Sequence, residues 1–364
     1  MRLATRWSSR TGGTGIIRGA FQFCWRLLKW GVTTALILVG VVGAYLYFKL
    51  DDEIARYAQA FLADHYQQLD VRIAGARYEH GVGVILSGVA LSAPRVERPP
   101  EPLLEIAELR LIGSFTKESL TTRKPRIDRI EIHRPRLMAT RRASGAWSVE
   151  SLLPPPAGDG SPTPVHIYDA TVVLSDEAQP AAQPLTLQNI DLRLNHTPTV
   201  DGGQRLEIRG RAEETLARLI DVQGEADPAS GRLNLVVQVQ QLGVTTERLL
   251  AAPGVPRLWL TGVSVNGQVD SMTTIRRESL MAPIDWQCNF TLNQGALSHP
   301  LLPKQMTDVQ VQGYCDPKGV RIDKATAKSG EAELNGMLNS MGWGPEARAS
   351  CQINVNGLAL GPGV

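Results

Sequence analysis

The chain has 364 residues, of which 43% are hydrophobic and 20% are charged, so it can hold two to three domains with packed cores. Its 38 basic and 36 acidic residues leave a formal net charge of +2, but residues 1–30 carry six basic residues and no acid. Four cysteines, one of them in this basic segment, exclude a disulfide framework.

Residues 30–50, WGVTTALILVGVVGAYLYFKL, are predicted to form a transmembrane helix. The uncharged apolar stretch at 32–48 is long enough to cross about 30 Å of hydrocarbon, with Trp30 and Tyr45 at the two interfaces. A cleavable signal peptide is the alternative, but its apolar region would be shorter, and the nearest A-x-A pattern, 58–60, lies beyond a charged run. We therefore expect an uncleaved anchor.

The charges on the two sides of this span predict its orientation. The basic tail, residues 1–29, precedes the span, and Asp51, Asp52 and Glu53 follow it. The positive-inside rule then places the tail in the cytoplasm and the rest of the chain outside it. Because no second stretch of spanning length follows, we expect a single-pass membrane protein.

Residues 51–69, DDEIARYAQAFLADHYQQL, are predicted to form one amphipathic helix. Ile54, Phe61 and Leu62 recur at helical spacing, and the acidic residues lie at the N-terminal end, where the helix dipole favours them.

From Asp70 onward the hydrophobic period is two, which is typical of β-strands. Strands joined by Gly, Asn, Asp and Pro turns follow one another, and a Pro/Gly-rich linker at 154–164 divides a β module at 70–153 from a repetitive β region at 165–364. The repeated layout favours a sheet that extends unit by unit. The last unit stops at NVNGLALGPGV, so we expect the repeat to be incomplete at this end.

The stretch RIDRIEIHRPRLMATRR, at 126–142, begins as a strand and is rich in arginine. Pro135, which has no N–H group to donate, is interpreted as the end of strand pairing at a sheet edge. With GVGVILSGVAL and PLLEIAELRL before it and ASGAW after it, this stretch resembles the N-terminal region of AsmA-like proteins. The resemblance covers about residues 30–155, and only the strand pattern agrees afterwards.

The resemblance implies an anchor in the bacterial inner membrane that carries a long, curved β-sheet into the periplasm. In such proteins the sheet forms a groove with an apolar inner face, related to the repeating β-grooves that transfer phospholipids between membranes or assist outer-membrane assembly and maintenance. The expected partners are therefore phospholipid acyl chains. A scaffolding protein that binds other envelope proteins through its sheet edges is the alternative.

No catalytic or cofactor motif stands out, so we expect neither an enzyme nor a bound metal or cofactor. Each histidine is isolated in the sequence, without the spacing of a metal site. Cys288, Cys315 and Cys351 are in phase with apolar neighbours and are interpreted as buried thiols, with a disulfide as the alternative. Nucleic acid is not an expected partner, because the basic stretch lies outside the cytoplasm.

Alternation in the repetitive region gives the candidate binding residues. In IDWQCNFTLN, for example, apolar and polar side chains fall on opposite faces of one strand. This face is a lipid track if the sheet stays open as a groove, and ordinary core if the strands form closed β-sandwich modules. The family resemblance favours the groove. The candidates are Leu235, Val237, Val239, Trp286, Cys288, Phe290, Leu292, Val309, Val311, Ile353 and Val355.

The arginines of the family-like stretch are candidates for contacts with anionic lipid headgroups, each adding about 1 kcal/mol if it approaches a membrane surface. A solvated strand face is the alternative. These residues are Arg126, Arg129, Arg134, Arg136, Arg141 and Arg142.

Overall fold

The computed structural model describes residues 51–357, apart from residues 80, 94–101, 115–125, 153–162, 181, 199–203, 214–215, 228, 254–259, 280, 301, 303 and 344–346. The predicted basic tail, the transmembrane helix and most of the predicted linker therefore lie outside the described residues. None of the helices within the described ranges is long and apolar enough to cross a bilayer. The chain divides into two compact units, Met1–Ile54 and Ala55–Val364, and the second contains the entire sheet.

The predicted amphipathic helix spans residues 51–65, four residues fewer than expected. A turn follows, in which Leu69 N donates to Tyr66 O at 2.9 Å, and the first strand begins at Asp70. Within the second unit, Gln59 of the helix donates from Nε2 to Val71 O at 3.0 Å, and Tyr66, the first residue after the helix, donates from Oη to Leu152 O at 3.4 Å.

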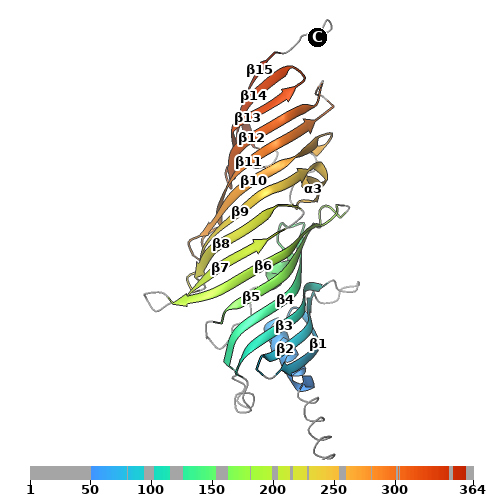
Figure 1. Cartoon of the computed structure of the whole chain (residues 1–364), viewed down its shortest axis with the longest axis vertical. Helices are drawn as coiled ribbons and strands as arrows, with labels where there is room; N and C mark the ends of the chain where they lie inside the picture. Colours follow the sequence, from blue (N-terminus) through green and yellow to red (C-terminus); the bar gives the residue numbers. More distant parts are fainter. Residues whose placement is uncertain are drawn as a thin grey trace, which may run out of the picture. The chain divides into compact units, whose positions relative to one another are not determined.

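The described residues that follow contain fifteen strands, which form one sheet whose spatial order is the chain order (Figure 1). Two short helices, η1 (Ser148–Leu152) and α3 (Thr246–Ala251), interrupt them. The strands are β1 (Asp70–Glu79), β2 (Gly83–Ser92), β3 (Pro102–Ser114), β4 (Arg126–Arg141), β5 (Val165–Asp176), β6 (Leu185–Pro198), β7 (Gln204–Ala212), β8 (Leu219–Asp227), β9 (Arg232–Thr245), β10 (Ser264–Arg277), β11 (Asp285–Ser298), β12 (Met306–Asp316), β13 (Gly319–Ser329), β14 (Ala332–Met341) and β15 (Arg348–Asn356).

The prediction of a mostly β chain with an extended, curved sheet is confirmed, and the alternative of closed sandwich modules is wrong for the described residues. All neighbouring strands are antiparallel except β4 and β5, which are parallel and lie on either side of the predicted linker. One sheet therefore runs through both regions that the sequence separated. β1 and β15 lie at opposite ends of the strand order and do not pair with each other, so the sheet is open.

Pro135 does not end strand pairing at an edge, contrary to the prediction. It lies inside β4, opposite Ile106 of β3, and it is buried. On its other side the ladder to β5 skips from His133 to Arg136. Arg134 has φ 50°. The missing N–H group of proline is thus placed where a local irregularity already interrupts the hydrogen-bond ladder.

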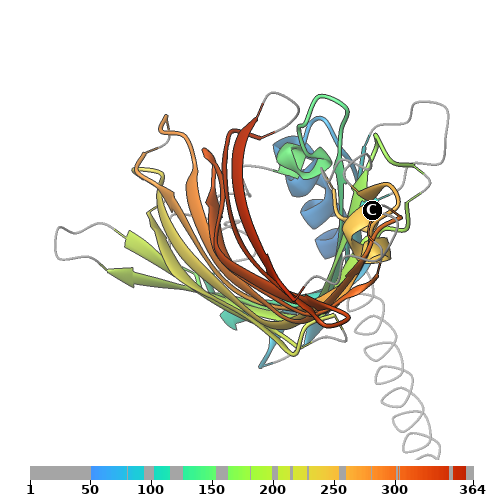
Figure 2. The ribbon, with the colours of Figure 1, turned by 90° about the horizontal axis from the view of Figure 1, so that it is seen from above.

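Irregularities of this kind recur across the sheet. Among the residues that the structure describes, six non-glycine residues have φ between 50° and 55°, a left-handed conformation that ordinary strands avoid. Two of their N–H groups are held by a carboxylate of the neighbouring strand: Asp169 N donates to Asp191 Oδ1 at 3.0 Å and Gln241 N to Asp270 Oδ1 at 2.8 Å. Bulges bend and twist a strand, so they contribute to the curvature of the sheet (Figure 2). The six residues are Arg134, Asp169, Asn189, Gln241, Gln294 and Asp308.

The tightly packed core lies at the N-terminal end of the sheet. Figures 1 and 2 place the helix at residues 55–65 inside the curve, against the first strands. Five apolar side chains of β1 and β2 are only 2–4% exposed there: Val71, Val84, Leu86, Val89 and Leu91. In β9–β15 the described apolar side chains are half-buried or exposed, except that of Ala332, which is 5% exposed. The packed core thus covers only part of the sheet.

Candidate functional site

One row of paired residues crosses all fifteen strands without a charged side chain. Directly paired residues of neighbouring strands point to the same side of a sheet, so the register identifies the two faces. We call the face that carries this row the apolar face. One residue per strand, in order, the row is Ala76, Leu86, Leu109, Ile132, Ile167, Leu192, Gly210, Val222, Val237, Thr273, Cys288, Cys315, Val320, Ser340 and Ala349.

The adjacent row points to the other side and is mostly polar or charged. We call that side the polar face. From β1 to β11 this second row is Arg77, Ile85, Arg110, Glu131, His166, Arg193, Arg209, Gln223, Val236, Thr274 and Gln287. The sheet therefore separates apolar from charged side chains over most of its length.

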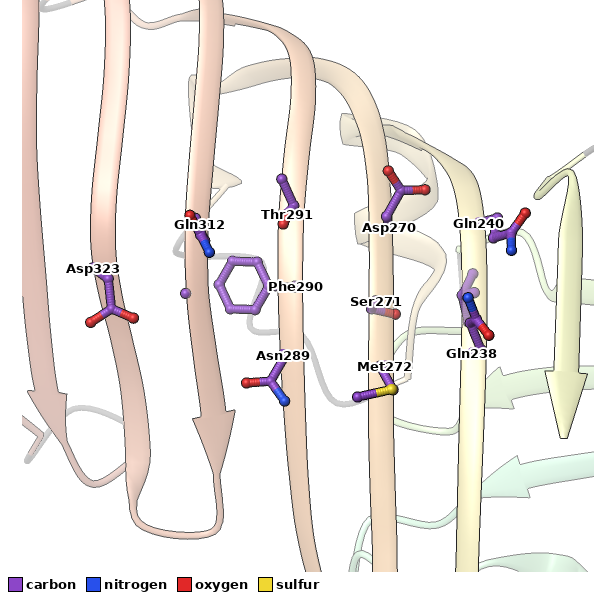
Figure 3. A pocket seen from close by; sticks show the side chains of 12 residues that line it. Gln238, Gln240, Asp270, Ser271, Met272, Asn289, Phe290, Thr291, Gln312 and Asp323 are labelled. Carbon is purple, nitrogen blue, oxygen red and sulfur yellow. The ribbon is translucent and has the colours of Figure 1, made fainter. Parts of the chain in front are cut away.

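The apolar face is the concave one. In Figure 3 the polar side chains of Gln238, Asn289 and Gln312 project from the near side of the sheet. Rotating Figure 1 within the plane of the page gives the strand order and strand directions of Figure 3. Both figures therefore show the polar face toward the viewer. Figure 2 shows that this side is convex and that the helix at 55–65 lies within the curve on the opposite side. The inside of the curve is consequently lined by the apolar face.

A shallow hollow on the polar face carries hydrogen-bonding groups but no catalytic arrangement. Its lining includes amide and hydroxyl side chains such as Gln238, Asn289 and Thr291 (Figure 3). The carboxylate of Asp270 accepts hydrogen bonds from Gln241 N at 2.8 Å and from Asn293 Nδ2 at 3.1 Å. It therefore stabilises the irregular backbone at Gln241 in the neighbouring strand. The hollow gives no sign of acid–base chemistry.

All eleven predicted lipid-contacting residues lie on the apolar face, in the four strands β9, β11, β12 and β15. A second row of paired residues shows that β9 to β12 share this face. Val239 pairs with Ser271, Ser271 with Phe290, and Phe290 with Gly313. Gly313, opposite Phe290, has no side chain that would compete with the ring for space. In β15, Ile353 and Val355 belong to the same face, and both are exposed. The other nine residues are half-buried: Leu235, Val237, Val239, Trp286, Cys288, Phe290, Leu292, Val309 and Val311.

The six predicted headgroup arginines do not form one cluster. Three of them make ion pairs: Arg126 with Asp128 at 3.2 Å, Arg129 with Glu131 at 3.0 Å, and Arg141 with Asp176 at 3.4 Å. The remaining three are exposed, namely Arg134, Arg136 and Arg142. Acidic neighbours therefore pair with three of the six arginines that are close together in the sequence.

The interpretation of three buried thiols is wrong: Cys351 is exposed and the other two thiols are half-buried. All three are free, and Cys288 is paired directly with Cys315 in the neighbouring strand. A hydrogen bond from the Cys315 thiol lowers the pKa of Cys288 from its ordinary value to about 6, with smaller help from the hydroxyls of Thr273 and Ser271. The same bond raises the pKa of Cys315. The apolar face thus holds one acidic thiol.

We expect Cys288 to be alkylated by iodoacetamide at neutral pH, with a rate that rises as the pH passes about 6 and the thiolate forms. Cys315→Ala removes the hydrogen bond and raises the pKa of Cys288, so less of its thiolate is present at pH 7. The thiolate of a less acidic thiol is more nucleophilic, which offsets part of this loss, so alkylation should slow by only roughly fourfold. Peptide mass spectrometry measures both rates, with the exposed Cys351 as an internal reference. An unchanged Cys288 rate in the variant contradicts the assignment.

Two histidines that are isolated in the sequence both contact Tyr168 on the polar face. The His133 ring stacks on Tyr168 with centroids 5.0 Å apart, and His166 Nδ1 lies 3.2 Å from Tyr168 Oη. Only the parallel pairing of β4 with β5 brings them together. Within the described ranges, no group of three or more His, Cys, Asp or Glu side chains is arranged to hold a metal ion.

Comparison with known proteins gives no family assignment. No protein-family model matches the chain, and no curated protein matches it either.

Proposed function

We propose that the concave apolar face is a groove that shields phospholipid acyl chains, and that the chain is an AsmA-like protein of the bacterial inner membrane whose sheet works in the periplasm. The observation that carries the proposal is the uncharged row that crosses every strand of an open, curved sheet. No described second layer covers this face in β9–β15, where its large apolar side chains stay half-buried or exposed.

The energetic argument concerns acyl chains in water. Two tails of about 16 carbons, at about 0.8 kcal/mol per CH₂ group, cost on the order of 25 kcal/mol to leave bare, so a lipid leaves a bilayer only into an apolar shelter. Burial is not directional, so a surface of Val, Leu, Ile and Phe side chains accepts many tail types. This explains why the apolar face needs no precise polar site.

The dimensions of the sheet also suit lipids. The helix covers the first strands, so the uncovered part runs from about β4 to β15, eleven intervals of about 4.8 Å or roughly 50 Å in all. One acyl chain spans about 15 Å, half the thickness of the hydrocarbon core. The uncovered face has room for about three lipids in file, which favours a conduit over a site for one molecule.

The N-terminal sequence supports a place at a membrane. The apolar stretch at 30–50 and the basic tail before it predict an anchor with the sheet on the far side of the bilayer. An anchored groove would assist phospholipid transfer or the assembly and maintenance of the outer membrane. A scaffolding role through the exposed edge strand β15 is the second candidate, because all nine of its residues are exposed.

Lipid bound to the purified full chain tests the proposal. We expect mass spectrometry of the extracted chain to find phospholipid that survives washing with detergent, and to find less of it when the apolar face carries a charge. A chain without such lipid, whose edge strand instead captures envelope proteins, supports the scaffold.

A further inference from the structure

Cys288 and Cys315 lie side by side on the apolar face. They are directly paired in the antiparallel strands β11 and β12, and both thiols are free. Directly paired residues of antiparallel strands have Cα atoms about 4.5–5.5 Å apart. This range lies within the Cα separation of about 4.4–6.8 Å that a disulfide requires. The backbone can therefore accept a bond between the two sulfurs without a shift of either strand.

The two side chains already face each other. The Cys315 thiol donates a hydrogen bond to the Cys288 sulfur, and so does the hydroxyl of Thr273, which is paired with Cys288 from the other neighbouring strand. Rotation of the two cysteine side chains then brings the sulfurs to the bonding distance of about 2.05 Å. Both cysteines are half-buried, so a small molecule can reach them from the open side of the sheet.

Cys351 has no cysteine beside it among the described residues. It pairs with Leu338 of β14, and three strand intervals separate β15 from β12. At about 4.8 Å per interval this amounts to roughly 14 Å, twice the Cα separation of about 7 Å beyond which two cysteines cannot be bridged. The register thus selects one pair of cysteines for bond formation.

The two paired thiols differ in acidity, which suits thiol–disulfide exchange. The hydrogen bond from Cys315 lowers the pKa of Cys288 to about 6, so Cys288 is largely a thiolate at neutral pH and acts as the nucleophile. The same hydrogen bond is the largest cause of the raised pKa of Cys315. This cause disappears once the Cys288 sulfur is bonded to another sulfur, and Cys315 then ionises more readily.

We propose that Cys288 and Cys315 are an oxidation site at which a small-molecule disulfide converts the two thiols into a disulfide that ties β11 to β12. The Cys288 thiolate attacks one sulfur of the reagent, whose S–S bond breaks and releases a first thiolate. Cys315 then loses its proton, and its sulfur attacks Cys288 and expels a second thiolate. Two protein thiols are oxidised by two electrons, the reagent is reduced to two thiols, and the two thiol protons pass to the thiolates released.

The disulfide would join two strands in the uncovered part of the sheet, and this effect does not depend on the proposed function. Each strand contacts only its neighbours, so strands can separate locally. Cys288 and Cys315 are 27 positions apart in the chain, and closing a loop of this length reduces the entropy of the opened state. We expect oxidation to slow hydrogen exchange in β11 and β12 by about tenfold or more, and to leave β2 and β3 unchanged as a control.

Oxidised glutathione tests the site on the purified full chain, which is reduced first. We expect peptide mass spectrometry to find Cys288 joined to Cys315, while Cys351 keeps bound glutathione. In Cys315→Ser the second attack is impossible, so glutathione should stay on Cys288. Unfolding the chain in urea should lower the yield of the Cys288–Cys315 bond by about tenfold or more, because the register no longer holds the two thiols together.

Three outcomes overturn the oxidation site. In the first, glutathione remains on Cys288 of the wild-type chain. In the second, Cys288 and Cys315 both stay reduced while Cys351 reacts. In the third, the bond forms equally well in urea, so that the folded register plays no part in it. Unchanged hydrogen exchange in β11 and β12 after complete oxidation refutes the tie between the strands.

Discussion

Val89→Ala lowers the local free energy of unfolding by about 2–3 kcal/mol, the transfer of two buried CH₂ equivalents plus a cavity term, whereas Val237→Ala lowers it by less than about 1 kcal/mol. Val89 in β2 is 2% exposed, whereas Val237 in β9 is only half-buried. The two positions are matched in residue type and in secondary structure. The comparison therefore isolates the effect of side-chain burial on stability.

Hydrogen exchange measured by mass spectrometry is the suitable readout, because an extended sheet in which each strand contacts only its neighbours need not unfold in one step. We expect Val89→Ala to speed exchange in β1–β3 and Val237→Ala to leave β8–β10 nearly unchanged. An equal loss of protection in both variants would mean that the apolar face is packed against a second layer at β9.

Phe290→Asp should reduce the phospholipid retained by the purified chain by about tenfold or more. A carboxylate beneath acyl chains costs roughly 2.5–3.5 kcal/mol at the centre of a bilayer, and the open side of the groove lets water lessen this penalty. Asn289→Asp adds the same charge to the adjacent residue of β11, on the polar face. We expect this control to keep the wild-type amount of lipid.

The measurement is the amount of phospholipid extracted from equal amounts of the two variants and the wild type. Alkylation of Cys288 checks that β11 is folded in each variant. Equal lipid loss in both variants would point to the added charge rather than to the face that carries it. No loss in either would remove Phe290 from the lipid path.

The alternation of apolar and polar residues was sufficient to predict the strands and to assign side chains to faces. The letters of IDWQCNFTLN already separate Trp286 and Phe290 from Asn289, and the register keeps that separation across β9–β13. The same letters fit a sandwich core, because periodicity reports that a face is apolar and not what covers it. Only the strand order distinguished one open sheet from two packed sheets.

Features that depend on pairing between strands could not be predicted. Pro135 reads as a strand end in the sequence, yet its missing N–H group falls at an irregularity beside Arg134, where the ladder to β5 is already interrupted. Cys288 and Cys315 are 27 residues apart in the chain and adjacent in the register. Bulges such as Gln241 and Asp308 carry no strong local signal, since their conformation is set by neighbouring strands.

A crosslinking scan along β11 tests the central claim most directly. A photo-reactive amino acid is placed in turn at each position from Trp286 to Asn293 of the full chain in cells, and lipid adducts are identified by mass spectrometry. The account predicts adducts that alternate with a period of two, present at Trp286, Cys288, Phe290 and Leu292 and absent at Gln287, Asn289, Thr291 and Asn293. Equal labelling on both faces, or no lipid adduct at the apolar positions, contradicts a lipid-lined groove.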